Sequence, residues 1–197
     1  MSGAEPSAQP PSKERRRLVL ASASPQRRAI LTRLGALFEV RPSGAEELEA
    51  GDPEQVATEN ALRKARAVRD PGRDELVLGV DTLVALDGDV YGKPADRAHA
   101  RRTLQALSGR THTVLSGLAL LDASGERTGL ARTEVSFRDL SEETIDWYLA
   151  REEWCGRAGG YAIQGAGAAL VRAIEGDYEN VVGLPLALLL DLLPDLL

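Results

Sequence analysis

The chain has 197 residues, enough for one domain with a hydrophobic core or for two small lobes. Charged residues make up 27% and hydrophobic residues 43%, the balance of an ordinary soluble globular protein. The formal net charge of -6 argues against a nucleic-acid-binding protein, so no nucleic-acid partner is expected.

The single cysteine, Cys155, excludes an intrachain disulfide, and with only two histidines a Cys/His zinc site is not favoured. Both features fit a reducing cytoplasm. No uninterrupted apolar run reaches the roughly 18 residues of a membrane helix. The most apolar stretch, "VVGLPLALLLDLLPDLL", is broken by Gly183, Pro185, Asp191 and Pro194. We therefore expect a cytoplasmic protein with no membrane partner.

In chain order, residues 1–16 contain three prolines and almost no apolar side chains, which predicts a disordered tail. The rest, 17–197, is predicted to form one domain. "RLVLAS" predicts a strand, followed by a helix from about Pro25 to Leu34 with Ser24 as N-cap and Gly35 as stop signal.

"LFEVRPS" predicts a second strand, and "DPEQVATENALRKARAVRD" predicts a second helix that begins after Asp52. "ELVLGVDTLVAL" is a buried strand that turns at Asp87-Gly88, and "ADRAHARRTLQAL" is a helix closed by Gly109. Two further strands, "THTVLSGLALLD" and "RTGLARTEVSFRDL", precede a helix capped by Ser141.

The glycine-rich segment "GRAGGYAIQGAGAALVRAIEGDYENVVGLP" is expected to join short strands and tight turns. A core strand or turn and then a short helix are expected at the C-terminus. Because strands and helices alternate first and long hairpins follow, the pattern favours a mixed sheet in an α/β fold.

The first strand-to-helix junction carries hydroxyls and positive charge. A helix N-terminus has unpaired N–H groups and a partial positive charge, so it can bind phosphate or carboxylate. Ser22 and Ser24 can donate hydroxyls, and Arg27 can offer a fork of donors. Taken alone, however, the motif favours a capped surface helix with solvated arginines.

Asp81 places one carboxylate inside the apolar run "LVLGVDTLVAL". A charge in a buried strand is unfavourable unless it is paired or binds a metal, which favours a functional role. The alternative is an aspartate that faces water or a cluster of helix N–H groups. Thr82 could point to the opposite face of the strand. Lys93, in the turn "YGKP", could hold a phosphate or simply be solvated.

Other candidates favour a structural role when taken alone. Glu39 is expected to be a half-exposed strand residue, and Lys64 a solvated lysine on a helix face. Gln164 is expected either to hydrogen-bond the edge of a base or to satisfy backbone groups of a turn. Cys155 is expected to be an inert packed thiol and His112 a structural residue.

Four motifs taken together, "LASASPQRRAIL", "GVDTLVALDGDVYGKP", "ALSGRTHTVLSGLAL" and "YAIQGAGAALVRAIEGDYENVVGLPL", resemble the Maf family of nucleoside triphosphate pyrophosphatases. The resemblance covers about Leu18 to Leu190. It implies a Maf/Ham1-like (ITPase-like) α/β fold, with an elongated mixed sheet and two lobes flanking a cleft, and a single Maf-like catalytic domain. It also implies hydrolysis of a nucleoside triphosphate to the monophosphate and pyrophosphate with Mg²⁺ or Mn²⁺, in a homodimer.

The resemblance also implies roles for individual residues. Asp81 would be the proton acceptor and, with Glu39, would hold the metal. The substrate-binding set would be Ser24, Gln26, Arg27, Lys64, Thr82, Lys93 and Gln164.

Substrate choice rests on three of these positions. Thr82 and Gln164 match the dTTP/UTP branch of the family, whereas Gln26 stands where that branch usually has arginine. Modified nucleotides are therefore included among the expected substrates.

Two other functions stay open on the sequence. One is a nucleotide-binding regulator of septum formation without essential catalysis, which would not depend on pyrophosphate release. The other is a generic phosphatase, which would release orthophosphate first.

Overall fold

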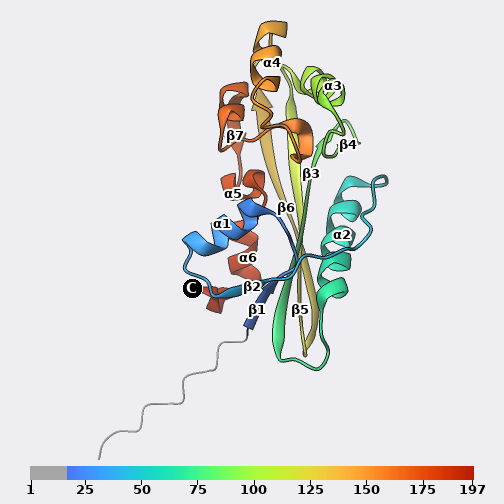
Figure 1. Ribbon diagram of the computed structural model, residues 1–197, viewed down its shortest axis with the longest axis vertical. Coiled ribbons are helices and arrows are strands. Elements are labelled where there is room, and N and C mark those ends of the chain that lie inside the picture. Colours follow the sequence, from blue (N-terminus) through green and yellow to red (C-terminus); the bar gives the residue numbers. More distant parts are fainter. Residues whose placement is uncertain (1–16) are drawn as a thin grey trace, which may run out of the picture.

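The computed structural model describes residues 17–197, and this part of the chain contains one seven-stranded mixed sheet flanked by helices (Figure 1). The strands are β1 (Arg17–Leu20), β2 (Phe38–Val40), β3 (Glu75–Leu86), β4 (Asp89–Tyr91), β5 (Thr111–Asp122), β6 (Gly125–Phe137) and β7 (Val171–Glu175). The sheet order is β2-β1-β3-β5-β6-β7, and β4 pairs with β3. The predicted tail, 1–16, lies outside the described residues.

The α-helices are α1 (Pro25–Arg33), α2 (Pro53–Val68), α3 (Arg97–Leu107), α4 (Glu142–Leu149), α5 (Tyr178–Val182) and α6 (Leu186–Leu192). The 3-10 helices are η1 (Ala158–Gly160), η2 (Ala166–Leu170) and η3 (Pro194–Leu196). In Figure 1, α2 lies on one side of the central strands and α1, α5 and α6 lie on the other. The long antiparallel strands β3, β5 and β6 extend past them toward α3 and α4 and make the molecule elongated, as predicted.

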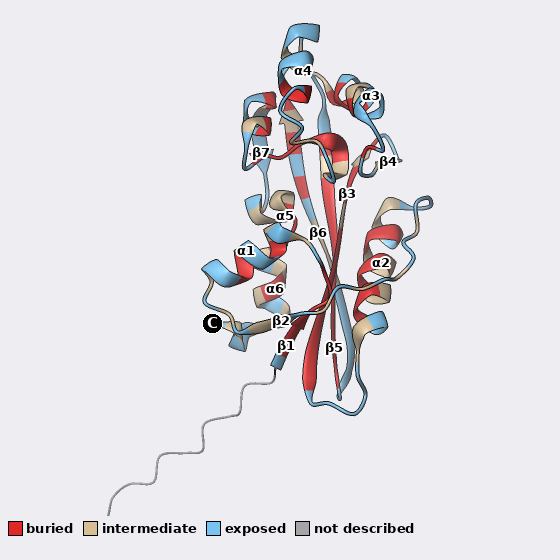
Figure 2. Cartoon of the chain, viewed as in Figure 1, coloured by how far each residue is buried: buried red, intermediate tan, exposed pale blue. Residues whose placement is uncertain are grey.

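Successive residues of the central strands face opposite helices, as the two-residue period of a strand requires. Leu18, Leu20, Leu76 and Leu78 belong to one core with residues of α1 and α6. Val19 and Val77 belong to a second core with Ala61 and Ala65 of α2. Figure 2 shows this burial along β1, β3 and β5. A third core at the other end of the molecule contains residues of α3 and α4, which gives the predicted two lobes.

Helix α2 packs directly against the backbone of the sheet at two glycines that face it. A Cβ added at Gly79 of β3 would lie 2.1 Å from the carbonyl oxygen of Ala61, and one at Gly117 of β5 would lie 2.1 Å from that of Ala57. Any side chain at either position would push the helix away. These glycines therefore set how closely the polar residues of α2 approach β3.

One edge of β3 is interrupted. Strand β1 runs parallel to β3 and its last pair is Leu20 with Leu78, extended by a hydrogen bond from Ala21 N–H to the Leu78 carbonyl (2.8 Å). On the same edge β4 begins to pair only at Val84. The intervening residues of β3, which include Asp81, face a gap in the sheet. Such a gap beyond the carboxyl end of a parallel strand is a usual place for a binding site in α/β folds.

Most predicted elements are present, and the differences lie near helix ends and in the glycine-rich segment. Helix α1 ends at Arg33, one residue before the prediction, with Leu34 as C-cap. The segment expected to be short strands and turns contains only one strand, β7, together with η1, η2 and α5. At the C-terminus a turn at Gly183, rather than a core strand, precedes the expected short helix.

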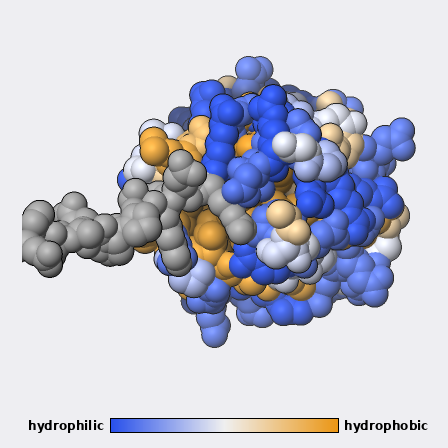
Figure 3. All heavy atoms as spheres, turned by 90° about the horizontal axis from the view of Figure 1, so that it is seen from below, coloured by the Kyte–Doolittle hydropathy of each residue, from blue (hydrophilic) through white to orange (hydrophobic). Residues whose placement is uncertain are grey.

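The end of the molecule seen in Figure 3 is largely hydrophilic with smaller hydrophobic areas. Leu37 and Leu197 are among the exposed large hydrophobic side chains. Across the described residues, every helix is too short or too polar to cross a membrane.

Candidate active site

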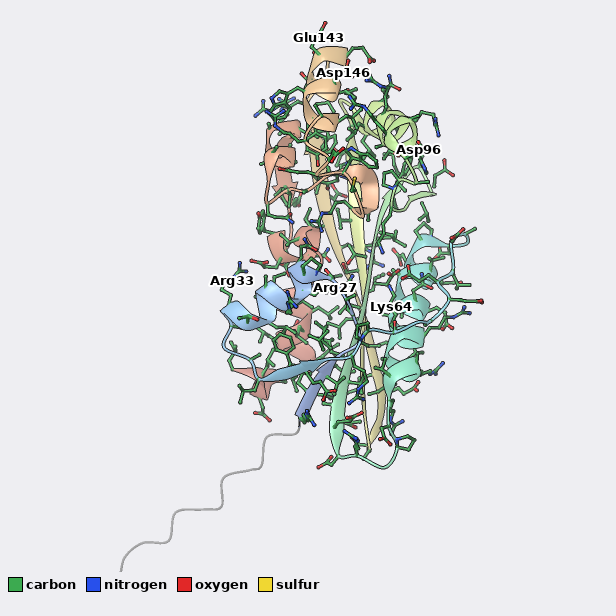
Figure 4. All side chains as sticks on the ribbon, in the orientation of Figure 1. Arg27, Arg33, Lys64, Asp96, Glu143 and Asp146 are labelled. Atoms are coloured by element: carbon green, nitrogen blue, oxygen red, sulfur yellow. The ribbon has the colours of Figure 1, made fainter. Side chains whose placement is uncertain are left out.

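A cavity of about 450 Å³ lies at the gap beside β3. Its lining comes from the β1–α1 junction, α2, β3, the turn after β4, the segment before η1 and the end of α5. Four cationic side chains line it, Arg27, Lys64, Lys93 and Arg157, against two acidic ones, Glu47 and Asp81. The cavity is therefore locally positive in a chain whose net charge is -6. In Figure 4, Arg27 and Lys64 come from helices on opposite sides of the central strands.

Asp81 is buried on the face of β3 that packs against α2. Its Oδ1 accepts a hydrogen bond from Lys64 Nζ at 2.5 Å, and its Oδ2 accepts one from Asn60 Nδ2 at 3.1 Å. The same Lys64 ammonium contacts Glu47 Oε1 at 2.8 Å. A buried charge is tolerated when it is paired and hydrogen-bonded in this way. Asp81 is therefore held in one orientation at the cavity wall.

Thr82 lies on the opposite face of β3, as predicted, where it meets Arg27. The guanidinium of Arg27 donates from Nε to the Gly183 carbonyl (2.8 Å), from Nη1 to Ser22 Oγ (3.0 Å) and from Nη2 to Thr82 Oγ1 (3.2 Å). Thr82 Oγ1 also contacts Ser116 Oγ at 2.8 Å. Since a guanidinium has five N–H donors, each terminal nitrogen of Arg27 keeps one for a further acceptor.

Burial lowers the pKa of Arg27, while the negative charges of Asp81 and Glu47 act to raise it. An arginine guanidinium is not deprotonated in proteins. Arg27 therefore supplies a permanent positive charge inside the cavity.

The first turn of α1 forms another wall. Ser24 is the N-cap, as predicted, and its hydroxyl oxygen accepts the Arg27 backbone N–H at 3.4 Å. The same hydroxyl donates to Gln26 Oε1 at 3.1 Å. The Ser24 backbone N–H donates to Ser22 Oγ at 3.2 Å. The serines thus order the helix N-terminus that points its partial positive charge toward the cavity.

The cavity brings together every site residue predicted from the sequence except Glu39. The cavity lining includes Ser24, Gln26, Arg27, Lys64, Asp81, Thr82, Lys93 and Gln164. Lys93 and Gln164 are exposed on its rim.

Glu39 is the exception, and its expected pairing with Asp81 at a metal is not met. Its side chain lies on the edge strand β2, where it makes ion pairs with Arg17 Nη2 (2.7 Å) and Arg41 Nη2 (3.3 Å). It is absent from the cavity lining. The physical reason is that two neighbouring arginines neutralise Glu39 at the sheet edge, so this half-buried acid needs no cation from the site.

Glu47 occupies the place that had been expected for Glu39. It belongs to the irregular segment between β2 and α2, lines the cavity and contacts Lys64. The run "AEELEA" around it has no strand or helix periodicity, so its acids could not be ranked from the sequence.

Near η1, the cavity lining includes Arg157, which the sequence did not indicate as a site residue, and Cys155, for which a packed thiol was expected. Arg157 lines the cavity, and its Nε is buried without a hydrogen-bond partner among the described residues. Cys155 is exposed in the cavity lining, so the expectation of a packed thiol was wrong. His112, in contrast, is buried and hydrogen-bonded to Tyr161, as a structural residue would be.

The donor set can be tested against the divalent metal that the family resemblance implies. Asp81 and Glu47 already share one cation, the Lys64 ammonium, so two carboxylates converge on one point. Mg²⁺ is usually held by one or two carboxylates together with substrate phosphates. No group of three or more His, Cys, Asp and Glu side chains that could hold a metal exists within 17–197. The residues therefore fit a metal shared with a phosphate ligand, not a cage built by protein alone.

Comparison with known proteins gives consistent likenesses. The model of the family described as Maf-like protein matches residues 17–196. The dTTP/UTP pyrophosphatase of Deinococcus radiodurans is 46% identical, covering 90% of this chain and 91% of that protein. The proteins of the same name from Gloeobacter violaceus (48% identical; coverage 91% and 95%) and Moorella thermoacetica (50%; 90% and 93%) are similar to it as well.

Among solved structures, the Staphylococcus aureus Ham1 protein aligns with a TM-score of 0.44 and 16% identity. The alignment covers 63% of this chain and 73% of that one.

Proposed function

Because the chain belongs to the family of Maf-like proteins, we propose that it is a nucleoside triphosphate pyrophosphatase acting on dTTP and UTP. Relatives that carry this name are 46% to 50% identical over about nine tenths of the chain. The observation that carries the proposal is the placement of Asp81, a fixed carboxylate at the wall of a cavity with excess positive charge.

The chemistry assigned to Asp81 is activation of water. The water oxygen attacks the α-phosphorus and forms a new P–O bond, while its proton moves to the Asp81 carboxylate. The bond between the α-phosphorus and the oxygen that bridges to the β-phosphorus breaks, and pyrophosphate leaves. Lys64 supports this role because its ammonium, 2.5 Å from Oδ1, holds the carboxylate in place at the cavity wall.

The triphosphate would be held by the cations and N–H groups around the cavity. Arg27 contributes its two remaining N–H donors, and the first turn of α1 contributes its helix N-terminus. Lys93 at the rim and Arg157 in the lining add further positive charge. Groups fixed in this way stabilise the charge that develops as the bridging bond breaks.

A divalent cation, Mg²⁺ or Mn²⁺, would be held by Asp81 and Glu47 together with substrate phosphate. When bound, it would neutralise phosphate oxygens and act as a Lewis acid.

Substrate choice is assigned to Gln164, Gln26 and Thr82. Gln164 is exposed at the cavity rim, so its amide can pair with a base edge. Gln26 is tied to Ser24, and the Thr82 hydroxyl to Arg27, so both act close to the phosphates. The name dTTP/UTP pyrophosphatase of the similar relatives supports pyrimidine triphosphates as substrates, and modified nucleotides are part of the proposal. On the basis of the family resemblance, the proposal also includes a homodimer and a cytoplasmic location.

The test is a product assay with a panel of normal and modified triphosphates, with Mg²⁺ and with Mn²⁺. The wild-type chain is expected to release pyrophosphate, fastest from dTTP and UTP. Asp81→Asn should lower kcat by about 10²- to 10⁴-fold, the usual contribution of a general base. Orthophosphate as first product would identify a generic phosphatase. A wild-type chain that binds nucleotide without turnover would instead support the regulatory function.

A further inference from the structure

Asn60 lies behind the cavity, on the face of α2 that packs against β3, and is 2% exposed. Its Nδ2 donates to Asp81 Oδ2 (3.1 Å) and to the Leu48 carbonyl (3.0 Å). Its Oδ1 accepts the Leu48 backbone N–H at 2.7 Å. A flipped amide would turn its oxygen toward two acceptors, so one orientation alone satisfies all three partners.

Lys64, one helical turn after Asn60, also contacts both Asp81 and the segment 47–48. Its ammonium contacts Asp81 Oδ1 and Glu47 Oε1. Residues four apart lie on the same helix face, so two neighbouring side chains of α2 each connect Asp81 to the segment 47–48. Each also holds a different oxygen of the Asp81 carboxylate.

The two connections differ in what can disturb them. Lys64 lines the cavity, where a phosphate or a metal ion would compete for the ammonium and for its carboxylate partners. Asn60 is absent from the lining, and its amide carries no charge for which such ligands would compete. The Asn60 connection can therefore persist when ligands change the environment of Lys64.

We infer that Asn60 is a positioning residue, which fixes the Asp81 carboxylate and the Glu47-bearing segment relative to each other. This inference rests on the proposed function. Because one nitrogen donates to both Asp81 and Leu48, a displacement of the segment 47–48 would turn the amide and release Asp81. Hydrogen-bond partners of this kind around a reacting or metal-binding carboxylate typically contribute 10- to 100-fold in activity or metal affinity.

The experiment uses Asn60→Ala and Asn60→Asp in the full chain. Asn60→Ala should lower kcat for dTTP about 10- to 100-fold with KM changed less than about threefold. It should also weaken Mn²⁺ binding, measured with inorganic pyrophosphate present as the phosphate ligand, at least about tenfold. Asn60→Asp keeps the side-chain shape and the bond from Leu48 N–H but cannot donate to Asp81. Its kcat should fall at least as far as that of Asn60→Ala.

Leu62→Ala is the matched control, since Leu62 packs from the same helix onto the core around Val19 and Val77. It should lower Tm while leaving kcat and Mn²⁺ affinity unchanged. The inference is overturned if Asn60→Ala behaves like Leu62→Ala, if Asn60→Asp is milder than Asn60→Ala, or if wild type binds Mn²⁺ no better than Asn60→Ala. Absence of pyrophosphate release by wild type would refute the proposed function instead, and the Mn²⁺ measurement would still decide the role of Asn60.

Discussion

Lys64 contacts two carboxylates from different parts of the chain, Asp81 on a strand and Glu47 in an irregular segment. Lys64 and Asp81 are both buried, so each depends on the other to offset the loss of hydration. Glu47 is more exposed and can exchange one cation for another. This makes Glu47, not Glu39, the acid whose removal should affect the site.

Glu47→Gln should lower kcat/KM for dTTP by at least about tenfold in the presence of Mg²⁺, because one of two converging carboxylates loses its charge. Glu39→Gln is the control, since Glu39 pairs with Arg17 and Arg41 on β2. Steady-state kinetics of both variants at several Mg²⁺ concentrations provide the measurement. Equal losses in the two variants would contradict the assignment of Glu47.

At this scale the sequence could identify Asp81, because a single charge in a long apolar strand requires a partner. It could not identify the partner. Glu39 looked like a half-exposed strand residue and was assigned to the metal only by the family resemblance, whereas Glu47 lies in an acidic run without periodicity. Which of them reaches the Lys64 ammonium beside Asp81 depends on the path of the chain between β2 and α2, a long-range property.

Among the elements, α2 is the one whose position decides the geometry of the site. It carries Asn60 and Lys64 on the face that meets Asp81. Its distance from the sheet is set by Gly79 and Gly117, where helix carbonyls come close to the strands. Packing and chemistry are therefore coupled through a single helix.

Gly117→Ala should lower the free energy of unfolding by about 1–3 kcal/mol and also reduce kcat. The added methyl would lie 2.1 Å from the Ala57 carbonyl oxygen, so the helix must shift. Gly44→Ala is the control, because a Cβ there meets nothing within 4 Å. Urea unfolding and dTTP kinetics test both variants. A Gly117→Ala protein that loses stability and keeps full kcat would show that the site tolerates a displaced helix.

Helix starts could be predicted because their signals are local. Ser24, Asp52 and Ser141 each accept the N–H three residues later, as their positions before the helices indicate. The glycine-rich segment could not be predicted, because distant partners determine its conformation. Strand β7 exists through pairing with β6, and the Ala162 N–H is bonded to the Tyr148 hydroxyl.

For the whole molecule, the cavity lies between cores that are formed by different ends of the long strands. The core around α3 and α4 reaches the cavity through Val84 and Tyr161.

His112 lies in the core around α3 and α4 and is 1% exposed. Its Nε2 lies 2.9 Å from the Tyr161 hydroxyl, and its ring is edge-on to Phe137. Its Nδ1 has no hydrogen-bond partner among residues 17–197. Protonation of His112 would therefore place an uncompensated charge in this core.

Burial lowers the pKa of His112 to about 4, whereas an unfolded histidine titrates near 6.5. Between pH 4 and pH 6.5 the unfolded chain binds a proton at His112 and the folded chain does not. The contribution of neutral His112 to the free energy of unfolding is therefore complete above about pH 6.5 and falls as the pH drops toward 4. The shift corresponds to about 3 kcal/mol.

His112→Gln removes the titrating group and keeps a polar side chain near Tyr161. Other acidic groups destabilise both proteins alike at low pH, so the comparison isolates His112. Urea unfolding of wild type and variant from pH 4.5 to 7.5 should show a steeper loss of unfolding free energy in wild type on the acid side. Parallel pH profiles would mean that the core accommodates the imidazolium, for example by opening to water beside Tyr161, which lines the cavity.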